Sequence, residues 1–264
     1  LYRTLLELGV EGMALSRRFL RDKYPPNRVL ALEYLAEHGA EDLFGQAVSL
    51  LMDKSGRVRE AAGEVVVQAD KDFDLRQFYR ERLPVRPAVA ILGLGETGNR
   101  GDCPAIAGFL SCPQSAVVRA AMTALMGLDP ERYSGAVTEK LAADQPGVVK
   151  TAALLLTKYR NFDPDRVFAI LQASPMENTR LKCAALLFCA GKWDRLTYAL
   201  TLLGSGYEKL DQACRRQLED WSHTYNRSYA ALGEEQRRRI LALLEEKGAY
   251  LRPAMVKQLR FLSK

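Results

Sequence analysis

Apolar residues recur at helical spacing along most of the chain, in short stretches that polar turns separate. Two consecutive apolar stripes illustrate the pattern: Leu43, Ala47, Leu50 and Leu51, and then Val58, Ala61, Ala62, Val65 and Val66. Each set falls on one face of an α-helix, and Asp53–Gly56 interrupts the chain between them. The alternation typical of a strand is scarce. The pattern therefore predicts an all-α chain built from short paired helices.

Helix punctuation agrees with these boundaries. Asp163-Pro164 has the order of an N-cap followed by proline at the first helical position, where the missing N–H costs nothing. The acidic cluster of Asp70, Asp72 and Asp74 lacks the glycine and terminal glutamate of a calcium loop. We therefore expect a solvated turn in which Asp72 or Asp74 caps the next helix.

A short motif repeats along the chain: an aliphatic residue, a cation, a spacer and a small residue that opens an apolar helix. The cations of the successive copies are Arg28, Arg59, Arg86, Arg119, Lys150, Lys182, Arg215 and Arg252, at spacings of 27 to 37 residues. A lone hairpin cannot bury both of its apolar faces, so neighbouring copies must stack. The sequence predicts an α-α superhelix: a right-handed solenoid of about eight helical hairpins in one domain over residues 1–264.

The motif resembles the HEAT repeat, in particular the short HEAT-like repeats of phycocyanobilin lyases. The resemblance is carried by Asp53 with Val58–Ala62 and by Leu92–Glu96, which matches the family's exit from the second helix. It implies an armadillo-like superhelix in which turn aspartates and second-helix cations support packing between repeats. That role would fall to Asp53, Asp144, Arg59, Arg119 and Lys150. Residues 192–264 match poorly and would form divergent terminal repeats or a cap.

Charge is distributed unevenly. The chain has 264 residues and a net charge of +6; residues 1–191 carry 24 basic and 23 acidic side chains, and residues 192–264 carry 14 and 9. This composition excludes a disordered chain, and no run of about 18 uncharged apolar residues could span a membrane. The basic, aromatic-rich C-terminal part leaves a nucleic-acid-binding HEAT-like solenoid open as an alternative function.

One glycine motif could be mistaken for a cofactor site. Gly93-Leu94-Gly95-Glu96-Thr97-Gly98 matches the GxGxxG pattern, which needs a helix opening at the glycines and an acidic residue about 20 positions later. The repeat register places these glycines in a turn instead. No acidic residue occurs between Asp102 and Asp129. We therefore expect no nucleotide cofactor.

The cysteine and histidine pattern predicts neither a metal site nor a catalytic centre. Five cysteines without a tight CxxC favour reduced thiols in a cytoplasmic protein, and His38 and His223 lie far apart. By analogy to the bilin lyases, Cys183 or Cys189 could take part in an enzymatic reaction. Both lie on an apolar helix, however, where burial makes a thiol inert. We expect no enzyme activity, no cofactor and no metal.

These features favour a non-catalytic protein–protein interaction scaffold with a concave surface formed by second helices. The candidate interaction residues are Arg59, Glu60, Arg119, Lys150, Lys158, Lys182, Trp221, Tyr225, Arg227 and Tyr229. The aromatic members could equally cover the last apolar face of a terminal cap. We expect a monomer that binds a protein partner of unknown identity. Because the chain begins at Leu1, it could also be the cytosolic part of a longer, membrane-tethered protein.

Overall fold

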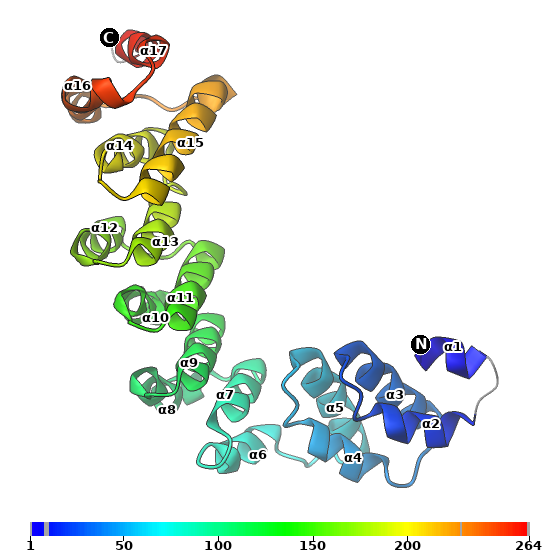
Figure 1. Cartoon of the computed structure of the whole chain (residues 1–264). Coiled ribbons are helices and arrows are strands. Elements are labelled where there is room, and N and C mark those ends of the chain that lie inside the picture. The colour runs from blue at the N-terminus through cyan, green and yellow to red at the C-terminus, as the bar shows by residue number, and fades with distance from the viewer. Residues whose placement is uncertain (1, 8–10, 228, 263–264) are drawn as a thin grey trace. The chain divides into compact units, whose positions relative to one another are not determined.

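The computed structural model describes residues 2–7, 11–227 and 229–262, and this part of the chain forms seventeen α-helices and no strand. The predicted all-α class is confirmed. The helices fall into two compact units, Leu1–Asp129 and Pro130–Lys264, which we call unit 1 and unit 2. Figure 1 shows the helices in chain order.

Unit 1 contains a short first helix followed by helices that pack in consecutive pairs. They are α1 (Tyr2–Glu7), α2 (Gly12–Phe19), α3 (Pro25–Glu37), α4 (Leu43–Leu50), α5 (Gly56–Ala69), α6 (Leu75–Arg82), α7 (Pro87–Glu96), α8 (Cys103–Ala107) and α9 (Ser115–Leu128). Short 3-10 turns span Arg100–Asp102 and Gly108–Ser111. α2 packs on α3, α4 on α5, α6 on α7 and α8 on α9, while α3, α5, α7 and α9 also pack on one another in succession. We call the later member of each pair its second helix.

Unit 2 follows the same plan. Its helices are α10 (Pro130–Glu139), α11 (Pro146–Tyr159), α12 (Pro164–Ala173), α13 (Glu177–Leu187), α14 (Lys192–Leu202), α15 (Glu208–Thr224), α16 (Glu234–Lys247) and α17 (Pro253–Leu262). Short 3-10 turns span Lys140–Ala142, Tyr225–Arg227 and Gly248–Tyr250. α10 packs on α11, α12 on α13, α14 on α15 and α16 on α17, and the second helix α13 lies between α11 and α15.

Several helices begin where the sequence predicts. Asp74 is the N-cap of α6 and accepts a hydrogen bond from the Gln77 amide at 2.9 Å. Asp163 caps α12, with Pro164 at the first helical position. Each cap satisfies a backbone N–H that the first turn leaves without an intrahelical partner. The predicted break at Asp53–Gly56 overlaps the turn between α4 and α5, and Gly56 is already the first residue of α5.

The glycines of the GxGxxG motif do not lie in a turn, contrary to the sequence prediction. Gly93 and Gly95 lie inside α7, and only Gly98, with φ of +75°, adopts a turn conformation. A Cβ at Gly93 would lie 2.2 Å from the Tyr79 ring, and one at Gly95 would lie 2.8 Å from the Cβ of Ala124. The first two glycines therefore allow α6 and α9 to approach α7 closely.

The aromatic C-terminal part is more helical than its sequence suggests. The stretch after Trp221, which has no clean helical period in sequence, continues α15 to Thr224 and then forms the 3-10 turn at Tyr225–Arg227. Trp221 is 1% exposed, packs against Trp193 and stacks on Tyr225. The indole N–H of Trp221 donates to the Lys192 carbonyl at 2.8 Å. The core of unit 2 therefore extends into this segment.

Candidate functional site

An arginine recurs in the first turn of three of the second helices, where it binds the preceding turn of the chain. The guanidinium groups of Arg28, Arg59 and Arg180 each donate to the backbone carbonyl six residues earlier, at Asp22, Asp53 and Ser174, over 2.6–2.7 Å. In each case the side chain of that earlier residue also accepts a hydrogen bond from the amide two residues later. We call these three residues the turn arginines. They fix the entry of the chain into α3, α5 and α13.

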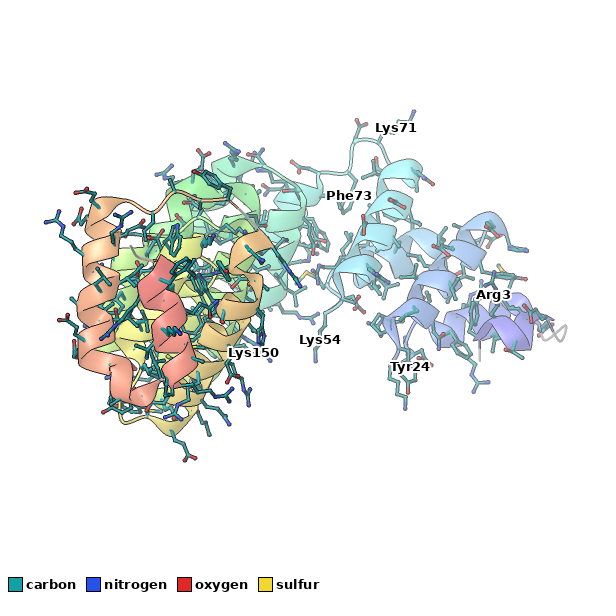
Figure 2. All side chains as sticks on the ribbon, turned by 90° about the horizontal axis from the view of Figure 1, so that it is seen from above. Arg3, Tyr24, Lys54, Lys71, Phe73 and Lys150 are labelled. Atoms are coloured by element: carbon teal, nitrogen blue, oxygen red, sulfur yellow. The ribbon has the colours of Figure 1, made fainter. Side chains whose placement is uncertain are left out.

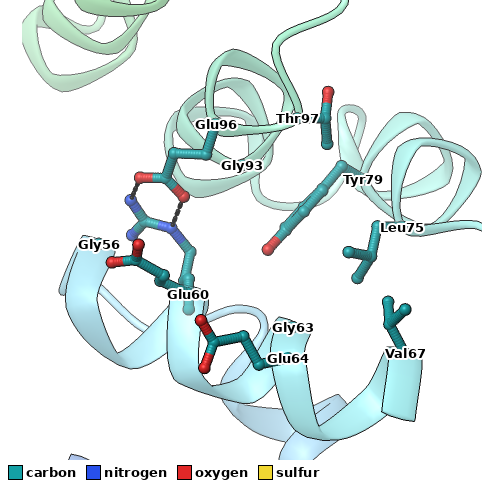
Figure 3. A pocket seen from close by; sticks show the side chains of 11 residues that line it. Gly56, Glu60, Gly63, Glu64, Val67, Leu75, Tyr79, Gly93, Glu96 and Thr97 are labelled. Atoms are coloured by element: carbon teal, nitrogen blue, oxygen red, sulfur yellow. Dashed lines mark hydrogen bonds and ion pairs between the residues drawn. The ribbon is translucent and has the colours of Figure 1, made fainter.

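Arg59 is the most buried of the turn arginines. Its side chain is 3% exposed, and its guanidinium forms a two-pronged ion pair with Glu96, a residue of α7 whose side chain is 44% exposed (Figure 3). Arg28 similarly pairs with Asp53 at 2.7 Å. The role implied for Asp53 and Arg59 by the family resemblance therefore agrees with their contacts, which join α3, α5 and α7.

The same role does not extend to the other residues named by resemblance. Arg119 and Lys150 are exposed, and neither forms an ion pair with a described residue. In the sixth copy of the motif, the residue that donates to the carbonyl of the preceding turn is Arg180 rather than Lys182. The position of a cation in the repeated motif therefore does not by itself determine whether its side chain is internal or exposed.

A cavity of about 600 Å³ opens between α5 and α7 in unit 1, and we call it the α5–α7 pocket. Its apolar side is formed by Gly63, Val67, Leu75, Tyr79 and Gly93. Figure 3 shows Tyr79 and Leu75 reaching it from α6 and Val67 from α5. The two glycines matter because neither places a side chain into the space between the helices.

Charged residues line the other side of the α5–α7 pocket. They are Arg59, Glu60, Glu64 and Glu96. Arg59 and Glu96 neutralise each other, whereas Glu60 and Glu64 are exposed and form no ion pair with a described residue. One turn separates Glu60 from Glu64, so both carboxylates lie on the same face of α5. The pocket therefore combines an apolar surface with two uncompensated negative charges.

Tyr79 is held firmly in the wall of this pocket. Its hydroxyl donates to the Leu51 carbonyl at 3.1 Å, and the residue as a whole is 4% exposed. Burial raises the pKa of Tyr79 to about 12, and the Glu96 carboxylate adds to the rise while Arg59 opposes it. The hydroxyl is thus neutral at physiological pH and serves as a hydrogen-bond donor within the wall.

The structure places the candidate interaction residues in different environments. Arg59 and Trp221 are buried in packing contacts, and Arg59 contributes only to the wall of the α5–α7 pocket; this corrects their assignment to an interaction surface. Glu60, Arg119, Lys150, Lys158, Arg227 and Tyr229 are exposed, whereas Lys182 and Tyr225 are half-buried. Lys150 and Lys158 share α11, and Lys182 lies on the adjacent α13. The Tyr225 ring stacks on the Trp221 ring, so these two candidate residues lie together.

An ion-pair cluster around a buried carboxylate in unit 1 was not apparent from the sequence. The Asp102 carboxylate has no exposed side-chain area and accepts from Arg76 at 2.6 Å and from Arg80 at 2.6 Å. Arg76 and Arg80 lie one turn apart on α6, which would have allowed them to be recognised as a pair. Their partner follows 22 to 26 residues later, and no periodicity indicates that distance.

None of the five cysteines, all of which the structure describes, forms a disulfide, but their exposure differs. Burial raises the pKa of the Cys183 and Cys214 thiols to about 12 in each case. Cys189 is exposed, contrary to the sequence prediction, because it follows the end of α13 and faces outward. In the described part of the chain, no group of three or more His, Cys, Asp or Glu residues is placed to hold a metal ion.

Among the described residues, none of the helices combines the length and apolarity needed to cross a membrane. Comparison of the chain with protein-family models and with curated proteins gives no match.

Proposed function

We propose that the chain is a non-catalytic protein–protein interaction scaffold, a HEAT-like solenoid of stacked helical pairs that binds partners through the exposed faces of its second helices. The packing of second helix on second helix within each unit supports this reading. The turn arginines support it further, because Arg28 and Arg59 repeat the same contacts at a spacing of 31 residues. Stacked hairpins of this kind present extended binding surfaces.

The observation that carries the proposal is the exposed face of α11. Lys150, Leu154 and Lys158 follow one another at four-residue intervals and lie along one side of the helix. Leu154 is 61% exposed, and both lysines are exposed without an ion-pair partner among the described residues. An exposed leucine between two uncompensated cations suits an acidic partner surface with an apolar centre. The nearby half-buried Lys182 extends the positive charge onto α13.

The proposal predicts that charge reversal on this face removes a specific partner. The variant carries Lys150→Glu and Lys158→Glu, and its matched control carries Arg238→Glu and Arg239→Glu, two exposed residues of α16. Each variant is used as bait beside the wild-type chain in an extract of the source organism, and bound proteins are quantified by mass spectrometry. We expect a partner that the wild type and control retain and the α11 variant loses. Identical captured sets for all three baits would contradict the proposal.

A further inference from the structure

The α5–α7 pocket has the chemistry of a receptor for a cationic side chain. Its volume of about 600 Å³ lies within the size range of ligand sites, and its walls are mainly apolar. An anionic ligand would meet Glu60 and Glu64, which repel it. A wholly apolar ligand would gain nothing from those carboxylates. A long aliphatic stem that ends in a positive charge matches both parts of the pocket.

The charge arrangement also indicates where the cation would sit. Arg59 already occupies the Glu96 end of the pocket, where its guanidinium pairs with that carboxylate and would repel a second cation. Glu60 and Glu64, which both lie on α5, form no ion pair with a described residue. Their two carboxylates are therefore available to a cation. Figure 3 shows both side chains on the α5 side of the opening, with Val67 and Leu75 beyond Glu64.

We propose that the α5–α7 pocket binds an arginine side chain of a partner protein, with the guanidinium between Glu60 and Glu64 and the aliphatic stem against Val67 and Leu75. Arginine fits better than lysine because its planar group can donate to two carboxylates at once. This inference rests on the proposed function, since it assigns the chemistry of one partner segment. It concerns unit 1 alone and does not depend on the lysine face of α11.

The test uses two synthetic peptides that differ in one property. One is a fluorescein-labelled nonapeptide of alternating arginine and leucine, and the other carries citrulline, a neutral isostere, in place of each arginine. Fluorescence anisotropy with the full chain measures the affinity. We expect the arginine peptide to bind about tenfold more tightly than the citrulline peptide, because each exposed ion pair contributes a small factor. Equal affinities would overturn the inference.

The position of binding is read from backbone amide signals by NMR. Gly56, Gly63 and Gly93 line the pocket, whereas Gly135 and Gly206 lie in unit 2. We expect the arginine peptide to shift the first group and leave the second unchanged. Shifts confined to unit 2 would overturn the assignment of the site.

Two variants keep the test independent of folding. Glu60→Gln with Glu64→Gln should weaken arginine-peptide binding about tenfold, while Glu234→Gln with Glu235→Gln, exposed on α16, should leave it unchanged. Gly63→Leu fills the pocket from a position where a Cβ meets only ordinary contacts, at 3.6 Å from Leu75 and 3.9 Å from Leu51. It should abolish binding while α-helical circular dichroism is retained. Unchanged binding by both pocket variants would contradict the proposal.

The two proposals can fail separately. If the peptide binds as expected but no captured protein depends on the α11 face, the scaffold function fails in its stated form and the pocket inference survives. If partner capture depends on α11 but arginine and citrulline peptides bind equally, only the pocket inference fails.

Discussion

Two glycine-to-alanine substitutions should have opposite effects on stability although both lie inside helices. Gly63 is in α5 and Gly95 is in α7. In a helix interior, alanine is favoured over glycine by about 1 kcal/mol. At Gly63 the new methyl group would lie 3.6 Å from Leu75 and 3.9 Å from Leu51, which is ordinary van der Waals contact. Gly63→Ala should therefore raise the free energy of unfolding by about 1 kcal/mol.

At Gly95 the same methyl group meets the backbone of another helix. It would lie 2.8 Å from the Cβ and 2.9 Å from the Cα of Ala124, so α9 must move away from α7. Overpacking of this kind costs about 1–3 kcal/mol, which offsets or exceeds the gain in helix propensity. We expect Gly95→Ala to lower the free energy of unfolding by about 1 kcal/mol, a difference of about 2 kcal/mol between the two variants.

The assay is urea unfolding of the full chain, followed by far-ultraviolet circular dichroism, with the wild type measured in parallel. The midpoint should rise for Gly63→Ala and fall for Gly95→Ala, with little change in the slope of either transition. Shifts of both midpoints in the same direction would refute the assignment of Gly95 to close helix packing. That result would also reopen the interpretation of the Gly93–Gly98 motif.

Three further predictions follow from the side-chain contacts. Glu96→Ala should destabilise the protein by about 2 kcal/mol because it leaves the buried Arg59 charge without its carboxylate partner. Glu64→Ala in the same pocket should change the free energy of unfolding by less than about 0.5 kcal/mol. Thermal unfolding of both variants tests this difference, and equal effects would contradict it. Because the fold favours the protonated hydroxyl, the contribution of Tyr79 to stability should be complete below pH 10 and fall by about 2 kcal/mol as the pH rises through its folded pKa of about 12. The difference in the free energy of unfolding between the wild type and Tyr79→Phe should shrink over this range. A constant difference would contradict the raised pKa of Tyr79. A thiol reagent added to the native protein should label the exposed Cys189 first, and the buried Cys183 and Cys214 only after unfolding. Peptide mass spectrometry measures the order of labelling. Early labelling of Cys183 would contradict its burial.

The sequence was most informative where a local pattern determines a local structure. Apolar periodicity identified the α4–α5 pair, and the caps at Asp74 and Asp163 could be anticipated because N-capping depends on residues only a few positions apart. The role of Gly93 and Gly95 could not be read in the same way. Gly93 is required by the close approach of Tyr79 and Gly95 by that of Ala124, and both neighbours come from other helices.

The candidate site was recognised only in part, for a related reason. Glu60 was identified as exposed on a second helix, but the α5–α7 pocket depends on Leu75 and Tyr79 from α6 and on Gly93 from α7. Arg59 and Arg119 have the same position in the repeated motif, yet one is buried and the other exposed. The difference lies in the hydrogen-bond partners: the distant Glu96 and the local Asp53 carbonyl hold Arg59, whereas Arg119 is exposed to solvent.

The exposed groups that have no internal role indicate where partners would bind. Figure 2 shows the side chains on both units, with Lys54 and Lys71 extending from the turns of unit 1. Such turn residues occur on many proteins and carry little information. Leu154 differs because it is a large apolar side chain that is 61% exposed on a second helix. Isolated exposed leucines are common on protein surfaces, and Leu154 is distinguished from them by its two flanking lysines.

Site-specific photo-crosslinking tests the central claim most directly. A photoreactive phenylalanine analogue replaces Leu154 on the second-helix face of α11 or, as a matched control, Met176 in the turn before α13; the two native side chains are 61% and 59% exposed. The two proteins are irradiated in extracts of the source organism, and adducts are identified by mass spectrometry. A defined protein adduct from position 154, absent from position 176, is the predicted result. Adducts of the same identity and yield from both positions, or none from position 154, would contradict partner binding through the second helices.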